Sequence, residues 1–476
     1  MRPLFIGGNR VDTPDTRSNI NPSNLNDVID HYCVADAKLT ERAIDAAVEA
    51  FSAWSVSDIQ LRHDVLRRTA DEIFARRHEL GNLLSREEGK TLKEGIAEVT
   101  RAANIFWFFA GEALRATGEI VPSVRSGATV EITREPVGVI GIISPWNFPI
   151  AIPAWKIAPA LCYGNTVVFK PAELVPGCAW EVADILHRAG LPAGVLNFVY
   201  GPGSVVGQAI LDSPKVNAVS FTGSVDTGKR VAEACARHMR RCQLEMGGKN
   251  PLVVLDDADL ENAVECAIDG SYFSTGQRCT ASSRLIVTEG IYSRFVEACV
   301  DRLNGQRIGD ARDPNTTIGP VVDQSQLDQD IDYIELGRRE GANLRWGGLR
   351  LSAVSEGFYL QPALFIDSGP HMRINREEIF GPVASVIRAR NYEEALSLAN
   401  DTPFGLTAGI CTSSFKHVQH FKRHAQAGMV MVNMPTAGVD FHVPFGGSKG
   451  SSLGQREQGT YAREFFTQVK TSYQRP

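Results

Sequence analysis

The sequence has no apolar stretch long enough to span a membrane, and Gly7 and Gly8 interrupt its start before a signal-peptide core could form. It also lacks an excess of basic charge, because 49 lysines and arginines are opposed by 55 acidic residues, a net charge of −6. No dense basic run offers a surface for nucleic acid. We therefore expect a cytoplasmic protein that binds neither a membrane nor nucleic acid.

The cysteine pattern excludes two further classes. Nine cysteines are scattered from Cys33 to Cys411 without CxxC spacing, and an odd number cannot all pair. This fits reduced thiols better than a disulfide framework or a zinc site, so we predict no metal centre. The 476 residues, 43% hydrophobic and 22% charged, indicate a soluble globular protein of two or three domains.

Hydrophobic periodicity predicts an α/β fold. Apolar residues recur at helical spacing over residues 39–54 and again over 61–74, so the N-terminal third is expected to open with helices. Beyond it, continuous apolar runs alternate with helix-like segments such as 179–189, which indicates a doubly wound parallel sheet. The runs lie at residues 137–143, 165–169, 195–200 and 218–221.

A second α/β unit is expected downstream. Residues 256–259 look like a strand-to-helix turn, and the unit that contains it extends to about residue 445. The β-prone segments 129–133 and 465–473 are able to pair as an arm outside both units.

Three side chains together have the chemistry to oxidise an aldehyde. Cys279 supplies a thiol nucleophile, Asn147 an amide for the oxyanion, and Glu245 a carboxylate that activates water. Each also has a plain structural interpretation, with Cys279 as a buried apolar filler, Asn147 as a turn residue and Glu245 as an exposed acid. The combination favours catalysis through a thioester.

With further motifs in the same chain order, these residues resemble the aldehyde dehydrogenase superfamily from about residue 20 to the C-terminus. The resemblance implies NAD(P)-dependent oxidation of an aldehyde to a carboxylic acid. It also implies the aldehyde dehydrogenase fold, in which a Rossmann-like cofactor domain faces a second α/β catalytic domain. The motifs are PWNFP at 145–149, FTGS at 221–224, LEMGG at 244–248, TGQRCT at 275–280, EEIFGPV at 377–383 and PFGG at 444–447.

The fold so implied divides the chain into three parts. In the family the arm joins subunits, so a homodimer or homotetramer is expected. We expect an NAD(P)-binding domain over residues 1–116 and 137–246, a catalytic domain over 247–460, and an oligomerisation arm over 117–136 and 461–476.

Glycine turns at strand ends predict where a dinucleotide binds, because backbone N–H groups there favour an anion. The turn from Gly201 to Gly207 departs from the dinucleotide fingerprint by one residue and is equally well interpreted as a tight turn. The resemblance assigns the pyrophosphate to Ser224 and the adenine to the neighbourhood of Gly203. The full set of expected cofactor contacts is Ser144, Pro145, Trp146, Lys170, Glu173, Gly203, Gly207, Phe221, Gly223, Ser224, Thr227, Met246, Glu378 and Phe380.

Glu173 determines the expected cofactor preference. Its carboxylate accepts a hydrogen bond from a ribose 2′-hydroxyl but repels a 2′-phosphate, which favours NAD over NADP. NADP use stays open, because Glu173 can swing away and leave Lys170 to meet the phosphate. A solvated charge pair is the plain alternative for these two residues, as are a helix-end carboxylate for Glu378 and a core aromatic for Phe380.

The substrate is expected to carry an acidic group. Arg101 precedes Ile105 and Phe108 at i, i+4 and i+7 on one helix face, which the resemblance places along the substrate channel. A guanidinium there would bind a carboxylate or sulfonate, although a solvated helix arginine is equally consistent. The expected channel residues are Arg101, Phe148, Trp155, Arg278 and Phe445, of which the aromatic ones also fit a plain core.

Segments 276–284 and 435–447 are similar to the branch that includes 2,5-dioxopentanoate dehydrogenases, which make 2-oxoglutarate. Succinate semialdehyde, sulfolactaldehyde and small hydroxyaldehydes are the alternative substrates. A CoA-acylating relative tends to lack the carboxylate at Glu245, and a non-catalytic member would have lost Cys279 or Asn147. Lys156 matches a family lysine near Glu245 and the cofactor, which implies a proton relay.

Overall fold

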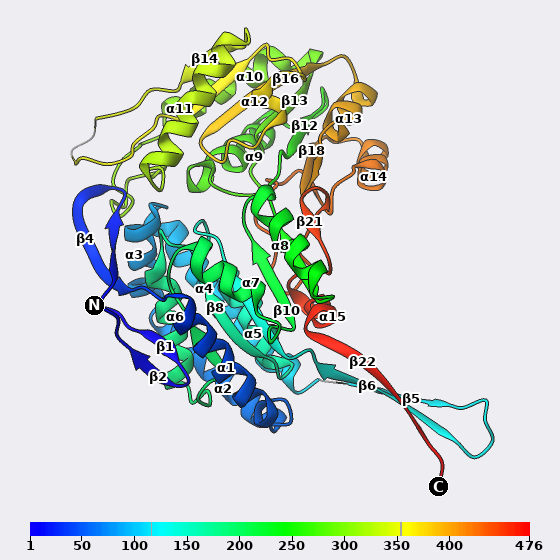
Figure 1. The fold of residues 1–476 in the computed structure, drawn as a ribbon. Coiled ribbons are helices and arrows are strands. Elements are labelled where there is room, and N and C mark those ends of the chain that lie inside the picture. Colours follow the sequence, from blue (N-terminus) through cyan, green and yellow to red (C-terminus); the bar gives the residue numbers. More distant parts are fainter. Residues whose placement is uncertain (116, 353–354) are drawn as a thin grey trace.

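The computed structural model describes residues 1–115, 117–352 and 355–476. Two α/β units lie one above the other, and a thin arm projects from the lower unit (Figure 1). Each unit is built around a largely parallel sheet, which confirms the predicted fold class. Among the described residues, no helix combines the length and apolarity needed to cross a membrane.

The sheet of the lower unit has eight strands. Strands β7 to β11 are mutually parallel and mostly buried, which explains why the sequence shows most of them as continuous apolar runs. In sheet order the strands are β2 (Asn9–Val11), β1 (Leu4–Ile6), β9 (Leu196–Phe198), β8 (Thr166–Lys170), β7 (Val139–Ile143), β10 (Ala218–Thr222), β11 (Arg241–Glu245) and β21 (Ser452–Leu453).

Helices surround this sheet, some in direct contact with its strands and others packed on those helices, and α1 and α2 confirm the two helical segments predicted before residue 75. The helices are α1 (Ala37–Trp54), α2 (Ile59–Ala75), α3 (Arg77–Glu88), α4 (Leu92–Ala113), α5 (Ala151–Cys162), α6 (Pro176–Arg188), α7 (Gln208–Asp212), preceded by the turn η1 (Gly203–Gly207), and α8 (Val225–Arg237).

The expectation that the chain opens with helices is wrong, because four strands precede α1. Two of them, β1 and β2, join the edge of the sheet, and the other two form the separate hairpin β3 (Thr16–Asn21) and β4 (Asn24–Cys33). This hairpin is polar and largely exposed, so it carries no hydrophobic period from which it could be predicted.

The upper unit has a seven-stranded sheet. As predicted, residues 256–259 connect a strand to a helix, and the Asp259 side chain caps α9 by accepting the Asn262 N–H at 2.9 Å. The strands in sheet order are β14 (Asn343–Gly347), β15 (Ala363–Ile366), β16 (Val383–Ala389), β13 (Arg284–Thr288), β12 (Pro251–Val254), β18 (Thr407–Cys411) and β19 (Met429–Val432). The helices are α9 (Leu260–Tyr272), continued by the turn η2 (Phe273–Gly276), α10 (Glu289–Asn304), α11 (Gln324–Arg339), α12 (Arg373–Arg376), α13 (Tyr392–Asn400) and α14 (Phe415–His424).

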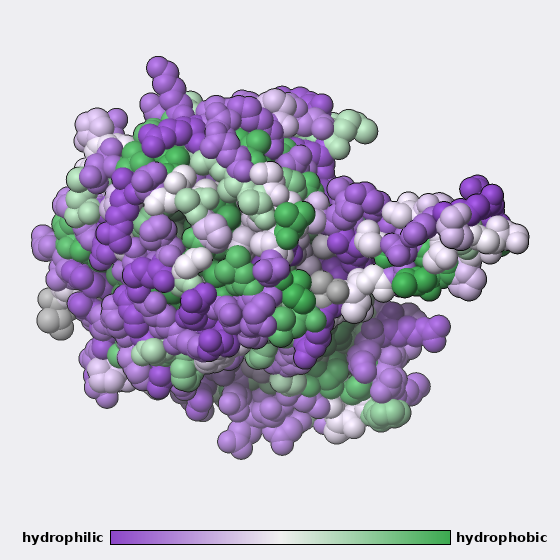
Figure 2. Space-filling model, turned by 90° about the horizontal axis from the view of Figure 1, so that it is seen from below, coloured by the Kyte–Doolittle hydropathy of each residue, from purple (hydrophilic) through white to green (hydrophobic). Residues whose placement is uncertain are grey.

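The arm consists of β5 (Glu119–Pro122), β6 (Thr129–Pro136) and the C-terminal β22 (Thr467–Gln474), with β6 in the middle. The predicted pairing of the tail with residues 129–133 is confirmed by the β22–β6 register. Ile120, Val124 and Val469 are exposed here, and Figure 2 shows apolar side chains along the arm.

After β19 the chain returns from the upper unit to the lower one. It passes through β20 (Ser448–Lys449), which pairs with β17 (Phe404–Gly405) from an earlier part of the chain, then β21, the turn η3 (Gly459–Ala462) and α15 (Arg463–Phe466). Strand β21 pairs with β11, so the end of the expected 247–460 catalytic segment supplies a strand to the cofactor-side sheet, contrary to that boundary. The expected boundary at residue 116 lies outside the described residues.

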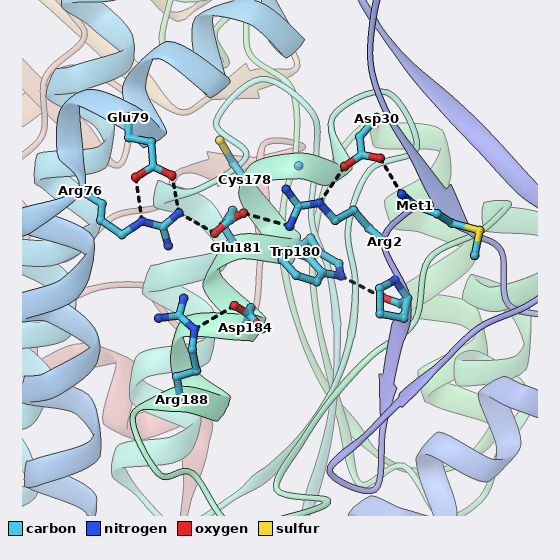
Figure 3. Close-up of polar contacts among 12 residues, drawn as sticks. Met1, Arg2, Asp30, Arg76, Glu79, Cys178, Trp180, Glu181, Asp184 and Arg188 are labelled. Atoms are coloured by element: carbon cyan, nitrogen blue, oxygen red, sulfur yellow. Dashed lines mark hydrogen bonds and ion pairs between the residues drawn. The ribbon is translucent and has the colours of Figure 1, made fainter.

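A chain of ion pairs fastens the N-terminus to the lower unit (Figure 3). Arg2 lies between Asp30, at 2.8 Å, and Glu181, at 3.5 Å, and Glu181 also pairs with Arg76 at 2.9 Å. The Arg2 guanidinium lies 4.4 Å from the ring centre of Trp180. These contacts join β4, α6 and the end of α2.

Candidate active site

The loop that carries Cys279 has an unusual backbone. In the turn η2, Ser274 and Thr275 have positive φ angles of 50° and 57°. Gly276 continues at 69°, and a Cβ there would lie 2.3 Å from the Gly381 carbonyl oxygen. Left-handed backbone in residues other than glycine is costly and clusters at functional sites.

Cys279 lines a pocket of about 470 Å³ whose wall comes from both units. Aromatic and charged side chains both contribute to the wall, and the rings of Trp155 and Phe445 stack with their centres 5.3 Å apart. The structure therefore brings the predicted channel residues together. Those that line the pocket are Arg101, Phe148, Trp155, Arg278 and Phe445.

Asn147 is buried beside the loop that carries Cys279, and both its side chain and its backbone carbonyl are hydrogen-bonded. Its side-chain Nδ2 donates to the Gln277 carbonyl at 3.0 Å, two residues before Cys279. Its own carbonyl accepts from Nζ of Lys90 at 2.7 Å, and Lys90 pairs with Glu98 at 2.6 Å. An amide nitrogen carries two N–H groups, so the bond to Gln277 leaves one for a further acceptor.

Glu245 ends β11 and is buried. Its carboxylate accepts from the hydroxyl of Ser452 at 2.6 Å and from the Gln243 amide at 3.4 Å. Burial, reinforced by the nearby Glu457 carboxylate, raises the pKa of Glu245 well above its ordinary value. A carboxylate with a raised pKa is suited to take a proton from water near neutral pH.

Lys156, on α5, belongs to the same buried network. Its ammonium pairs with Glu457 and donates to the Ser220 hydroxyl at 2.9 Å. It also lies 3.4 Å from the Gln243 side-chain oxygen, so Gln243 links Lys156 to Glu245. The sequence analysis missed Glu457, which occurs in no motif and is distant from Lys156 along the chain.

The surroundings of Cys279 favour its protonated thiol. Burial raises its pKa to about 12, and the Glu378 and Glu245 carboxylates add to the rise. Arg278 opposes it, but its guanidinium donates to the backbone carbonyls of α9, at 2.6 Å for that of Asp269. The neighbouring arginine therefore activates the thiol less than adjacency in the sequence suggests.

Most of the predicted cofactor residues gather at one edge of the lower sheet, because parallel strands end there together. Ser144, Pro145 and Trp146 follow β7, Lys170 and Glu173 lie at the end of β8 and just beyond it, and Gly203 and Gly207 follow β9. Phe221, Gly223, Ser224 and Thr227 join β10 to α8, and Met246 follows β11.

The upper unit contributes Glu378 and Phe380 to this region. The rings of Phe380 and Trp146 meet edge to face with centres 5.3 Å apart. Glu378 accepts the Gly248 N–H at 2.7 Å, and burial raises its pKa to about 7.

The edge of the sheet fits a dinucleotide. Ser224 caps α8 by accepting the Thr227 N–H at 3.4 Å, which places a hydroxyl at a helix N-terminus. A Cβ on Gly203 would meet nothing within 4 Å, so there is open space above this turn. Among the described residues, the buried Ser144 hydroxyl finds no hydrogen-bond partner, and a bound ligand would supply one.

Glu173 pairs with Arg17 of β3, which the sequence analysis did not identify. The alternative of a charge pair between Glu173 and Lys170 is not seen among the described residues, and Lys170 instead donates to the Pro171 carbonyl at 2.9 Å. No sequence pattern relates residues so far apart along the chain.

Arg101 lines the pocket, but Ile105 and Phe108, which were predicted to line the channel from the same helix face, do not. Ile105 is fully buried in the core, and Phe108 packs edge to face on Phe109. The pocket side of α4 instead includes Asn104, because positions three residues apart also share a helix face.

The aldehyde dehydrogenase family model matches residues 10–472. The chain belongs to the aldehyde dehydrogenase family. It is 47% identical to an alpha-ketoglutaric semialdehyde dehydrogenase of Bacillus subtilis, over 96% of this chain and 94% of that protein. It is 40% identical to a 2,5-dioxopentanoate dehydrogenase of Saccharolobus solfataricus, over 96% and 95% of the two chains. The enzyme is therefore an NAD(P)-dependent aldehyde dehydrogenase, as the resemblance implied.

Solved structures agree with this assignment. The fold superposes on betaine aldehyde dehydrogenase from Staphylococcus aureus, crystallised in complex with NAD+, with a TM-score of 0.97 and 34% identity. The match covers 100% of this chain and 95% of that chain. That relative holds NAD+, and the strand-end residues of this chain fit a dinucleotide.

Proposed function

We propose that this enzyme oxidises 2,5-dioxopentanoate to 2-oxoglutarate, with NAD preferred over NADP. Support comes from the relatives whose names state this substrate, at 47% and 40% identity over nearly the whole chain. The preference for NAD is supported by Glu173, whose carboxylate suits a free ribose hydroxyl.

Cys279 is the proposed nucleophile. As the thiol proton passes to water, the sulfur bonds to the carbonyl carbon of the aldehyde and the C=O π electrons move to the oxygen. This oxyanion accepts hydrogen bonds from the free N–H of the Asn147 amide and from the Cys279 backbone N–H. NAD, when bound, accepts the hydride that leaves this carbon, so that a thioester remains on Cys279.

Glu245 is the proposed base for the second half of the reaction. It takes a proton from a water molecule, the water oxygen attacks the thioester carbon, and the sulfur of Cys279 is released as the carboxylic acid forms. Gln243 is hydrogen-bonded to both Glu245 and Lys156, and Lys156 pairs with Glu457. This connected set of polar groups supports a proton path from Glu245 away from the pocket.

The observation that carries the substrate assignment is Arg101. Its side chain is partly buried in the pocket wall, and among the described residues its one hydrogen bond runs from Nη2 to the Gln458 side-chain oxygen at 3.0 Å. Its Nε is buried and finds no partner among the described residues. A partly buried cation with an unsatisfied donor favours an anionic ligand, and a dioxo acid brings a carboxylate at the end opposite its aldehyde.

Steady-state reduction of NAD with a panel of aldehydes tests the assignment. The panel contains 2,5-dioxopentanoate, succinate semialdehyde, sulfolactaldehyde, a small hydroxyaldehyde and pentanal, each with and without CoA. The highest kcat/KM is expected for 2,5-dioxopentanoate without a requirement for CoA. A higher kcat/KM for pentanal would refute the acidic substrate, and dependence on CoA would refute hydrolysis through Glu245.

We also propose that the enzyme is a cytoplasmic homodimer or homotetramer. The arm supports self-association. Ile120 and Val469 are exposed on its ladder and Val124 on the connection between β5 and β6, and the outer edges of β5 and β22 pair with no other strand among the described residues. Light scattering should give a mass of two or four chains, and Val469→Asp should lower it. A monomeric unmutated protein would contradict the proposal.

A further inference from the structure

Arg17 lies at the edge of the lower sheet where the predicted cofactor residues gather. Its guanidinium adds a positive charge to the proposed adenosine site. Its Nη1 pairs with one oxygen of the Glu173 carboxylate. The other oxygen accepts the backbone N–H of Gly203 at 2.9 Å. Both oxygens of Glu173 are therefore bonded within the protein, and its negative charge is opposed by a guanidinium.

Both partners of this ion pair are held in place. On the Arg17 side, the buried Asn19 of the same strand donates to Glu87 of α3 at 2.7 Å. On the Glu173 side, the hydroxyl of Tyr200 donates to the Glu173 backbone carbonyl at 2.9 Å. The strand that carries Arg17 and the backbone of Glu173 are thus anchored, while the Arg17 side chain itself is about half exposed.

Lys170, the other cation at this edge, is less suited to bind a phosphate. Its ammonium is buried against the Pro171 carbonyl, and burial lowers its pKa to about 8. Arginine stays charged at any working pH and presents a planar set of donors that matches phosphate oxygens. The partly exposed Arg17 is therefore the stronger phosphate ligand of the two.

We propose that Arg17 is a specificity-determining residue that lets the adenosine site accept a ribose 2′-phosphate as well as a free 2′-hydroxyl. This inference rests on the proposed cofactor site around Glu173. With a hydroxyl, the Arg17–Glu173 pair stays intact and Glu173 accepts a further hydrogen bond. With a phosphate, the guanidinium turns to the phosphate oxygens and screens them from Glu173, whose carboxylate alone would repel them.

Equilibrium binding to the full-length apoenzyme tests this, measured by calorimetry with AMP and with adenosine 2′,5′-bisphosphate, which differ only in the 2′-phosphate. The unmutated enzyme is expected to bind both. Arg17→Met should weaken the bisphosphate about tenfold or more and leave AMP within about twofold, because one charge-assisted contact is lost. Arg17→Lys should recover part of the difference, and Glu173→Gln should tighten the bisphosphate.

Arg10→Met is the matched control. Arg10 is an exposed arginine on the neighbouring strand β2, and it pairs with Asp184 at 2.7 Å instead of with Glu173. It should change the binding of neither ligand. Equal weakening of both ligands by Arg17→Met, or no change in either, would overturn the role of Arg17. Failure of AMP to bind the unmutated enzyme, or to compete with NAD, would instead overturn the proposed adenosine site itself.

Discussion

Replacement of Arg101 by alanine tests the proposed contact with the substrate carboxylate. The guanidinium carbon lies 5.6 Å from the Trp155 ring centre, and the buried Nε has no partner among the described residues. Burial lowers the pKa of Arg101 to about 10, so the side chain still carries its charge at pH 7 to 8. Such a cation binds an anion more strongly than a solvated one, because water does not compete.

The size of the effect follows from the charge of both partners. A hydrogen bond to a charged group is worth about 1.5–3 kcal/mol, and about 1.4 kcal/mol corresponds to a tenfold change. Arg101→Ala should therefore lower kcat/KM for 2,5-dioxopentanoate by about 10- to 150-fold, mostly through a higher KM, since the contact is the same in the ground and transition states. Pentanal has no carboxylate and should be scarcely affected.

The assay compares kcat/KM for the two aldehydes in both proteins by the rate of NADH formation. Arg67→Ala is the control, because Arg67 is exposed on α2 and pairs with the nearby Asp71 at 3.0 Å. An equal loss for pentanal and the dioxo acid would show that Arg101 is structural. Unchanged kinetics with the dioxo acid would refute the anion contact.

Three further predictions concern the reaction itself. Cys279→Ala should abolish aldehyde oxidation but leave NAD binding by calorimetry intact, and turnover beyond trace contamination would remove Cys279 as the nucleophile. Glu245→Gln should give a burst of NADH of about one equivalent per subunit followed by slow turnover; steady-state rates like those of the unmutated enzyme would mean that another base acts. Because burial and Glu457 raise the pKa of Glu245, and only its ionised form accepts a proton, kcat should rise with pH through a range above that of an ordinary glutamate. Glu457→Gln should move this rise to lower pH, and an unchanged pH profile would contradict the coupling.

Local hydrophobic patterns in the sequence were enough to predict many of the helices and strands. The buried parallel strands β7, β8 and β10 are apolar on both faces, so they appear as uninterrupted runs, and the spacing in α1 follows its buried face. The hairpin of β3 and β4 could not be found in this way, because its stability depends on contacts such as that of Asn19 with Glu87 and not on its own composition. The pairing of β21 with β11 in the sheet of the lower unit could not be predicted either. Strand β21 has only two residues, too few to show a pattern, and it is far from β11 along the chain.

The sequence by itself determined the family and the chemical groups of the reaction, because Cys279, Asn147 and Glu245 lie in motifs whose residue types are set by the chemistry. Only the tertiary structure decided the surroundings that tune these groups. Burial raises the pKa of the Cys279 thiol, and Glu457 does the same for Glu245, across separations that no local pattern encodes. The same holds for Arg17 and Glu173, which are brought together by the packing of a polar hairpin on the lower unit. Charge–charge interaction depends on distance in space and on desolvation, and both are fixed only when the chain has folded.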